Sequence, residues 1–416
     1  MIIKLNHLQQ LAVDLIMNSP RNSKLGLYGE AGTGKTFLLR QLTDSARIAF
    51  TAPTNKAVKV LIDSGCNPTD CMTIYSFLGL VVNEATGKVS IDKRGACKSK
   101  KYDILVVDEG SMADDIISAK LKKLNHIKII IVGDDAQLFP VNLRYSPAFS
   151  LVSESITLTE QMRQNDANHP IRPLLSTLRK AILTKSNIIP DLSKYAGQVR
   201  GDDGINRSVI VIRNTSNFTK LLESASDILN TDFCSAIAYR NARVDYINQL
   251  CHSSIYPQSE FLYSKGEKLI LQRPYSVSEY LTMSIGDIVQ VDDIEQQSTP
   301  VYIGNVKFEI PSLLINDMFL VPSDKDGFND MLSVMASQLN KGDKSFGWKS
   351  YYNLRDLFLH VKHSYCVTTH TAQGSTYDTT FIDSRDILSL PGSIEEKLRC
   401  LYTALSRTKL HTIILI

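Results

Sequence analysis

The chain has 416 residues, which is more than one hydrophobic core usually accommodates, so about two to four domains are expected. Hydrophobic residues make up 43% and charged residues 21%, a composition that excludes a disordered chain. The net charge of +3 excludes a polycation but permits a local basic groove. The seven cysteines are odd in number and form no C-x-x-C pair, which argues against a disulfide scaffold or a zinc ribbon and favours a reducing cytosol.

Neither a membrane span nor a cleavable signal is expected. No apolar run approaches the roughly 18–20 residues that a membrane span needs. The first residues, MIIKLNHLQQLAVDL, form an amphipathic pattern with an acid in it, unlike a signal sequence.

Short apolar runs alternate with helical patterns from the start of the chain, which predicts parallel sheets with helices on both faces, an α/β fold. The expected helices include 37–43 and 56–63, and the expected strands are 25–28, 48–51, 104–107, 127–132, 209–212 and 234–238.

Two further patterns interrupt this alternation. Residues 81–91, VVNEATGKVSI, predict a hairpin that turns at Thr86 and Gly87, and a basic stretch overlaps its end and runs to residue 101. Short β-like runs between turn residues fill 254–360 and predict a small, mostly β module, within which 328–339 and 351–360 also fit helices. Strands are expected again at 365–369, 379–382 and 412–415.

The most specific motif is GEAGTGKT at residues 29–36, which matches G-x-x-x-x-G-K-[ST] in full. It follows a predicted strand and opens a predicted helix, so its backbone amides would converge on phosphate oxygens. Lys35 would hold the β- and γ-phosphates, and Thr36 would ligate Mg²⁺. The candidate nucleotide-binding residues of this segment are Gly29, Gly32, Thr33, Gly34, Lys35 and Thr36.

An acid pair, Asp108 and Glu109, follows the apolar run ILVV. The pair would therefore lie at the carboxyl edge of a parallel sheet, where ligands bind. Asp108 would hold Mg²⁺, and Glu109 would orient and deprotonate the attacking water. The alternative interpretation is a strand-end acid pair that caps the next helix.

Several short segments, in a fixed order, resemble the motifs of superfamily 1 helicases, most closely the 5′→3′ RecD/Dda-like subgroup and phage Dda-type DNA helicases. The resemblance covers nearly the whole chain. It rests on TAPTNKAVKVL at 51–61, TIYSFLGL at 73–80, VVDEGSM at 106–112, GDDAQLFPV at 133–141, LTEQMRQ at 158–164, TTHTAQGST at 368–376 and LYTALSRTK at 401–409.

The resemblance implies further roles at the nucleotide site. Gln9 matches an adenine-reading glutamine, Gln137 a γ-phosphate sensor, and Arg163 and Arg407 two arginine fingers. Each arginine taken alone would be a surface ion pair. Gln373 and Gly374 would link the site to the nucleic-acid surface. The sequence departs from the pattern at Met162, where some relatives carry a stacking tyrosine, and at Asn55 and Tyr75, where relatives tend to have histidine.

A translocating enzyme grips the nucleic-acid backbone with small polar groups, amides and a few basic or aromatic side chains. His370 taken alone would be an ordinary strand-end histidine. The candidates for this track are Pro53, Thr54, Lys56, Thr73, Tyr75, Thr368 and His370.

The resemblance implies two RecA-like P-loop domains with a small β-hairpin insertion and an SH3-like β-rich insertion. The expected boundaries are 1–78 with 102–154 for domain 1A, 79–101 for the domain 1B hairpin, 155–253 with 361–416 for domain 2A, and 254–360 for domain 2B. The basic stretch near the hairpin could also be a solvated loop.

The implied function is an ATP- and Mg²⁺-dependent DNA helicase, stimulated by DNA and moving 5′→3′ on single-stranded DNA at forked duplexes. A single-strand-binding protein or a replisome component is the candidate partner, with no membrane and with action as a monomer. By analogy, such a chain suits phage or bacterial replication or recombination in the cytoplasm, the host's if it is phage-encoded. The alternatives are a single-strand-stimulated ATPase that displaces proteins without efficient unwinding, and a small-molecule kinase or nucleotide switch.

Overall fold

The computed structural model describes two compact units. The first combines 1–215, 237–241 and 368–416, and the second combines 216–236 and 242–367. Within these spans the structure describes residues 5–30, 32–42, 46–82, 89–91, 96–140, 143–160, 169–201, 203–276, 282–283, 285–304, 306–342 and 345–416.

The N-terminal part of the first unit is a six-stranded sheet in which every neighbouring pair is parallel. The strand order is β3-β2-β6-β7-β1-β8. Its strands are β1 (Lys24–Gly29), β2 (Ile48–Ala52), β3 (Cys71–Thr73), β6 (Ile104–Val107), β7 (Lys128–Gly133) and β8 (Glu154–Leu158). The order brings the carboxyl ends of β6, β7 and β1 next to one another, which positions the loops that follow them.

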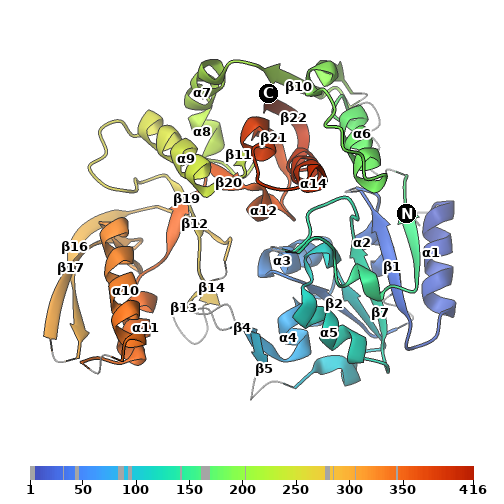
Figure 1. Ribbon diagram of the computed structural model, residues 1–416, viewed down its shortest axis with the longest axis horizontal. Coiled ribbons are helices and arrows are strands. Elements are labelled where there is room, and N and C mark those ends of the chain that lie inside the picture. Colours follow the sequence, from blue (N-terminus) through green and yellow to red (C-terminus); the bar gives the residue numbers. More distant parts are fainter. Residues whose placement is uncertain are drawn as a thin grey trace. The chain divides into compact units, whose positions relative to one another are not determined.

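Helices cover both faces of this sheet (Figure 1). Alternate residues of β7 enter different cores, because successive side chains of a strand point to opposite faces. Ile130 and Val132 pack in one core, and Ile129 and Ile131 pack in the other. The first core includes residues of α1 (His7–Asn18), α2 (Lys35–Arg40) and α3 (Asn55–Asp63), and the second includes residues of α4 (Ile74–Leu78) and α5 (Asp115–Lys123). The predicted α/β class is confirmed.

A second six-stranded sheet has the order β20-β11-β21-β22-β10-β9. Strands β10 and β21 pair with β22 in parallel, and β9 closes one edge in the antiparallel direction. The strands are β9 (Gly197–Arg200), β10 (Asn206–Ile212), β11 (Cys234–Ala238), β20 (Cys366–Thr368), β21 (Tyr377–Asp383) and β22 (Thr408–Leu415). The helices of this region in the first unit are α6 (Arg172–Leu183), α12 (Thr369–Ala372), α13 (Ser384–Leu388) and α14 (Ile394–Leu405).

The second unit contains the predicted β-rich module, in which all the described strand pairs are antiparallel. It comprises β12 (Lys268–Leu271), β13 (Tyr275–Ser276), β14 (Thr282–Met283), β15 (Ile288–Gln290), β16 (Ile294–Ile303), β17 (Val306–Ile315), β18 (Phe319–Pro322) and β19 (Val361–His363). Both segments that also fitted helices are helical, as α10 (Lys325–Asn340) and α11 (Trp348–Leu357). Three more helices complete this part of the chain: α7 (Thr215–Ser224), α8 (Ser226–Leu229) and α9 (Asn241–Ile255).

The predicted hairpin before residue 101 is confirmed in its strands. β4 (Leu80–Val82) pairs in antiparallel fashion with β5 (Val89–Ile91). The turn at Thr86 and Gly87 lies outside the described residues.

The sequence did not predict β3, β8 or β9. Strand β3 has only three residues, and β8 and β9 lie at sheet edges with mostly exposed side chains, so none of them produces an apolar run. No helix in the described part of the chain is long and apolar enough to cross a membrane.

Candidate functional site

The loop after β1 folds around the ammonium group of Lys35. Its Nζ donates to the carbonyl oxygens of Gly29 and Glu30 at 2.7 and 2.8 Å. Gly29 has a φ of 150°, and a Cβ there would lie 2.5 Å from the carbonyl oxygen of Leu158. This position therefore requires glycine. Burial lowers the pKa of Lys35, and the carboxylates of Asp134, Asp108 and Glu109 partly offset that effect.

This loop borders a cavity of about 370 Å³ within the first unit. The cavity gathers residues from the carboxyl ends of β1, β6 and β7 and from the C-terminal segment of the chain. Nine predicted site residues line it: Gly32, Gly34, Lys35, Thr36, Asp108, Glu109, Gln137, Gly374 and Arg407.

Both acids at the end of β6 line this cavity. Glu109 stands at the N-cap position of the short 3-10 helix Gly110–Met112, but its side chain forms no capping bond. The amide of Ile117, in α5, donates instead to Asp114, at 2.9 Å, so the capping interpretation is wrong. Glu109 has a φ of 49°, an uncommon conformation for a residue other than glycine and one that is frequent at functional sites. Burial and the adjacent Glu109 raise the pKa of Asp108 to about 7.

The residues present fit a Mg²⁺ ion. Thr36 and Asp108 line the same cavity and offer a hydroxyl and a carboxylate oxygen, the hard donors that Mg²⁺ prefers. Burial penalises the charge on Asp108, and a bound cation would compensate that penalty.

Arg407 enters the cavity from the C-terminal segment. It is 4% exposed, and its guanidinium donates to the carbonyl oxygens of Thr403 and Ser375 at 3.0 and 3.3 Å and to the hydroxyl of Ser406 at 2.8 Å. These partners are uncharged, so Arg407 is not the surface ion pair that a lone arginine would suggest.

Gln373 does not line the cavity but connects two of the loops that do. Its Nε2 donates to the hydroxyl of Ser111 at 3.3 Å and to Oε1 of Gln137 at 3.4 Å. The segment after β20 therefore contacts both the loop after β6 and the loop after β7.

Sequence reasoning missed a buried network around Asp134. Arg179, on α6, forms ion pairs with Asp134 and Asp135, and the hydroxyl of Tyr402, on α14, donates to Asp134 Oδ2 at 2.8 Å. Burial alone would lower the pKa of Arg179, but Asp134, Tyr402 and Asp135 outweigh it and hold that pKa above its usual value.

A second missed residue, Arg399, fixes the same loop. Its Nη1 donates to the carbonyl oxygens of Asp135 and Gln137 at 2.6 and 3.0 Å, and its guanidinium lies 3.9 Å from the ring centroid of Phe139. Short polar motifs carry no signal for such partners, because these contacts join residues more than 260 positions apart.

Gln9 lies outside the cavity lining and is fully buried. Its Oε1 accepts from the amide of Asn6 at 3.1 Å and completes the capping box of α1. Its Nε2 lies 3.5 Å from the carbonyl oxygen of Thr33. The side-chain amide thus supports both the start of α1 and the phosphate loop.

The three predicted track threonines share one position, the N-cap of a helix that follows a strand. Thr54 accepts from the amide of Ala57 at 3.2 Å, Thr73 from Ser76 at 3.1 Å, and Thr368 from Thr371 at 3.2 Å. Strands β2 and β3 are parallel neighbours, so Thr54 and Thr73 lie at adjacent strand ends. A hydroxyl that accepts a capping bond keeps its own proton for a further bond.

The other track candidates lie beside these caps. Pro53, Lys56 and Tyr75 are half-buried, and burial raises the pKa of Tyr75. Burial lowers the pKa of His370 below its usual value, so this side chain is a neutral hydrogen-bonding group at pH 7. The ring of His370 lies 6.2 Å from that of Tyr239.

One predicted catalytic residue, Arg163, lies in 161–168, outside the described residues, as does Met162. Its position relative to the cavity stays a prediction.

Comparisons with known proteins give two family matches. A model of the AAA domain family matches residues 4–184, and a model of the UvrD-like helicase C-terminal domain matches residues 363–415. An uncharacterized protein of Acanthamoeba polyphaga mimivirus is 24% identical, in an alignment that covers 97% of this chain and 98% of that protein.

Solved helicase structures share the fold. Pif1 helicase from Candida albicans is similar with a TM-score of 0.51 and 17% identity, over 100% of this chain and 94% of that chain. Pif1 helicase from Bacteroides, in complex with ADP-AlF3 and single-stranded DNA, has a TM-score of 0.51 and 14% identity, over 99% and 92%. The fold is that of two RecA-like domains.

The two family models describe an AAA domain and the C-terminal domain of a UvrD-like helicase, and the solved helicase structures share the fold. They agree with the geometry of the cavity, in which a complete phosphate loop meets the C-terminal Arg407.

The Asp134 network yields a stability prediction. Arg179→Gln leaves the buried Asp134 carboxylate without its countercharge and should lower the free energy of unfolding by roughly 3–5 kcal/mol. Arg47→Gln, which removes an exposed ion pair with Asp103, should lower it far less, because water and salt screen exposed charges. Urea unfolding should be followed by circular dichroism, because the single tryptophan, Trp348, lies in the other unit.

The double variant Arg179→Gln with Asp134→Asn should recover part of the loss, because a neutral amide needs no countercharge. Equal losses for the buried and the exposed arginine would contradict this account of the network.

Proposed function

We propose that this chain is an ATP-dependent DNA helicase of the RecD/Dda-like subgroup that moves 5′→3′ along single-stranded DNA. One observation carries the proposal: residues from both ends of the sequence line one cavity of about 370 Å³. Lys35 and the acid pair come from the N-terminal sheet, and Arg407 comes from the segment after α14.

ATP would enter this cavity with its phosphates against the loop 29–36. Lys35 would exchange its two carbonyl partners for oxygens of the β- and γ-phosphates. Mg²⁺, held by Thr36 and Asp108, would supply positive charge to the same phosphates. Gln137 and Glu109 would orient water beside the γ-phosphate, and Glu109 would accept its proton.

Arg407 would stabilise the charge that develops on the γ-phosphoryl group as the bond breaks. Its bonds to two carbonyls and a hydroxyl hold the guanidinium at the cavity wall without neutralising it. Arg163 is proposed as a second finger by resemblance alone.

Gln373 offers the route by which nucleotide state reaches the nucleic acid. Its amide contacts Gln137 at the cavity, and it directly follows α12, whose N-cap is Thr368. Loss or gain of a γ-phosphate beside Gln137 would shift this segment and change the grip of Thr368 and His370. Alternate gripping by the two RecA-like halves would then advance the enzyme along one strand.

Phosphate contacts suit the three N-cap threonines. Each hydroxyl accepts a backbone bond and has a proton that it can donate to a phosphate oxygen without reading the base. The Thr368 hydroxyl also lies 2.9 Å from that of Thr371, and a phosphate oxygen would take the place of this contact. The Bacteroides Pif1 complex with single-stranded DNA shares the fold and supports this choice of ligand. Duplex forks are the proposed substrate, with strand separation at the β4–β5 hairpin.

The second candidate is an ATPase that displaces proteins from single strands without efficient unwinding. It is favoured by the composition of the hairpin, whose described strands contain no aromatic wedge residue. The match to a helicase C-terminal domain does not favour the remaining alternative, a small-molecule kinase or nucleotide switch.

The remaining features of the proposal follow the resemblance. They are the boundaries of the four domains given above, action as a monomer, and phage or bacterial replication or recombination as the setting, in the cytoplasm. A single-strand-binding protein or replisome component is the proposed partner.

Replacement of the proposed general base tests the hydrolytic site. Glu109→Gln should slow ATP hydrolysis by roughly 10²–10⁴-fold while ATP still binds, because the amide keeps the shape but cannot accept the proton. Glu154→Gln, on an exposed edge strand, should leave the rate unchanged. Steady-state ATPase with and without single-stranded DNA measures both, and wild-type turnover in Glu109→Gln would contradict the assignment.

Thr368→Val should weaken single-stranded DNA binding and DNA-stimulated ATPase while it spares the basal rate, because it removes the phosphate donor. Thr368→Ser, which restores the hydroxyl, should recover binding. Asp324→Ala loses an N-cap in α10 and controls for helix fraying. Fluorescence anisotropy over a salt series measures these affinities, and wild-type affinity should fall steeply as salt rises. If the affinity depends neither on the Thr368 hydroxyl nor on salt, the nucleic-acid track lies elsewhere.

Tail polarity separates the proposed helicase from its alternatives. A duplex with only a 5′ single-stranded tail should be unwound with ATP and Mg²⁺, and a duplex with only a 3′ tail should not. Unwinding from the 3′ tail alone would contradict the assignment to the 5′→3′ subgroup. ATPase stimulation without unwinding of either substrate would favour the protein-displacing ATPase.

A further inference from the structure

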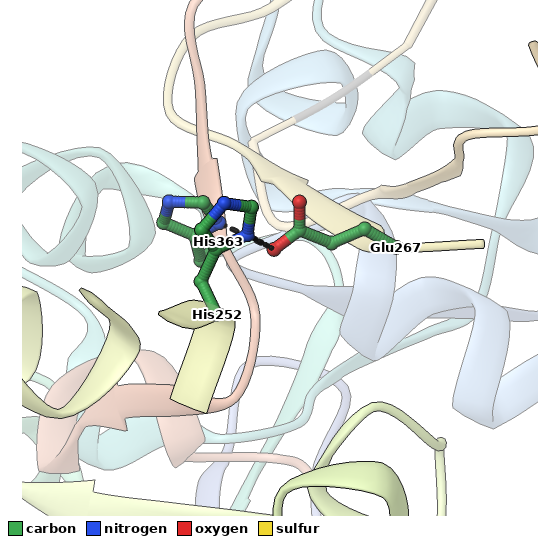
Figure 2. Close-up of side chains that lie close together, drawn as sticks. All are labelled: His252, Glu267 and His363. Carbon is green, nitrogen blue, oxygen red and sulfur yellow. Dashed lines mark hydrogen bonds and ion pairs between the residues drawn. The ribbon is translucent and has the colours of Figure 1, made fainter. Parts of the chain in front are cut away.

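Two histidines and a buried glutamate meet in the second unit, which contains none of the site residues assigned above (Figure 2). His252 lies near the end of α9, Glu267 immediately precedes β12, and His363 ends β19. His252 precedes the β-rich module in the sequence, and His363 lies in its last strand, so the cluster joins the helix before the module, its first strand and its last strand.

The carboxylate of Glu267 is the centre of this cluster. Its Oε1 lies 2.5 Å from His363 Nδ1 and 3.1 Å from His252 Nδ1. The side chain of Glu267 is fully buried, whereas those of His252 and His363 are 12% and 15% exposed. An ion could therefore reach the imidazoles from solvent without unfolding the module.

Further bonds orient the carboxylate. The hydroxyl of Tyr365 donates to Oε1 at 2.7 Å, and the amide of Ser264 donates to Oε2 at 3.1 Å. Partners of this kind fix the orientation of ligating carboxylates in metal sites.

We propose that His252, Glu267 and His363 bind one divalent transition-metal ion of the zinc type. One ligand atom from each residue lies within 4.8 Å of the other two, which is close enough to share an ion. Two imidazoles and one carboxylate are a donor set that zinc accepts, with water in the fourth position. Mg²⁺ and Ca²⁺ prefer sites made of oxygen alone, so they do not suit this cluster.

Binding requires a small local rearrangement. Ligands of a tetrahedral zinc ion with bonds of about 2.0–2.1 Å lie roughly 3.3 Å apart, so His363 must move away from Glu267 by somewhat less than 1 Å. Each imidazole must present the lone pair of its Nδ1, and its proton then resides on Nε2. The ion would hold α9 together with β12 and β19, the first and last strands of the β-rich module.

Titration of the purified full chain with Co²⁺ and with Zn²⁺ tests the site. The experiment uses untagged protein without nucleotide, in excess Mg²⁺ so that the phosphate loop does not compete. One equivalent of Co²⁺ should give the visible absorption of a four-coordinate ion, without a thiolate charge-transfer band, and Zn²⁺ should displace it. A chain that takes up no ion, or an ion held by thiolates, would overturn the proposal.

Substitutions of the three residues identify the ligands of the ion. This test measures metal affinity and does not depend on ATPase activity. His252→Gln, His363→Gln and Glu267→Gln should each weaken Zn²⁺ binding by more than about 100-fold, because each removes a direct ligand. Tyr365→Phe, which removes only an outer hydrogen bond, should weaken it by roughly 10–100-fold. His411→Gln, whose imidazole contacts Ser208 in the other unit, should bind as wild type does.

Wild-type affinity in both His252→Gln and His363→Gln would show that the ion sits elsewhere and would refute the site. The wild-type titration remains decisive even if a variant fails to fold.

Discussion

The nucleotide site depends on the ion pair and the hydrogen bond that hold the buried carboxylate of Asp134. Asp134 begins the loop after β7, and its carboxylate is held by Arg179 from α6 and Tyr402 from α14. A buried charge is stable only when it is paired and hydrogen-bonded, so these three residues specify how the helices meet the sheet. Arg407 follows α14 closely in the sequence, and its place at the cavity follows from that anchoring.

The chemistry divides between parts that are local in sequence and parts that are assembled by folding. The phosphate loop is complete within eight residues, because glycine conformations and a lysine on the following helix suffice to make an anion site. The groups that would act on the γ-phosphate are instead contributed by three separate segments around Glu109, Gln137 and Arg407. An enzyme built in this way can link the occupancy of one cavity to the position of distant segments.

Much of the fold and of the site was predictable from the sequence. The buried strands β1, β2, β6 and β7 are continuous apolar runs, and the loop 29–36 is a specific motif, so local patterns sufficed. The edge strands β8 and β9 gave no apolar run, because water covers most of their side chains. Arg179 and the His252, Glu267 and His363 cluster were missed for another reason: each depends on contacts between segments far apart in the chain, which a single sequence does not reveal.

Arg407 is proposed to act on the transition state of ATP hydrolysis from the C-terminal segment. The most direct measurement is single-turnover hydrolysis by Arg407→Gln in the presence of single-stranded DNA, together with the dissociation constant for ATP. We expect the hydrolysis rate to fall by roughly 10³-fold or more, with ATP affinity changed by only a few-fold. A variant that hydrolyses ATP at the wild-type rate, or that only binds ATP more weakly, would contradict this role.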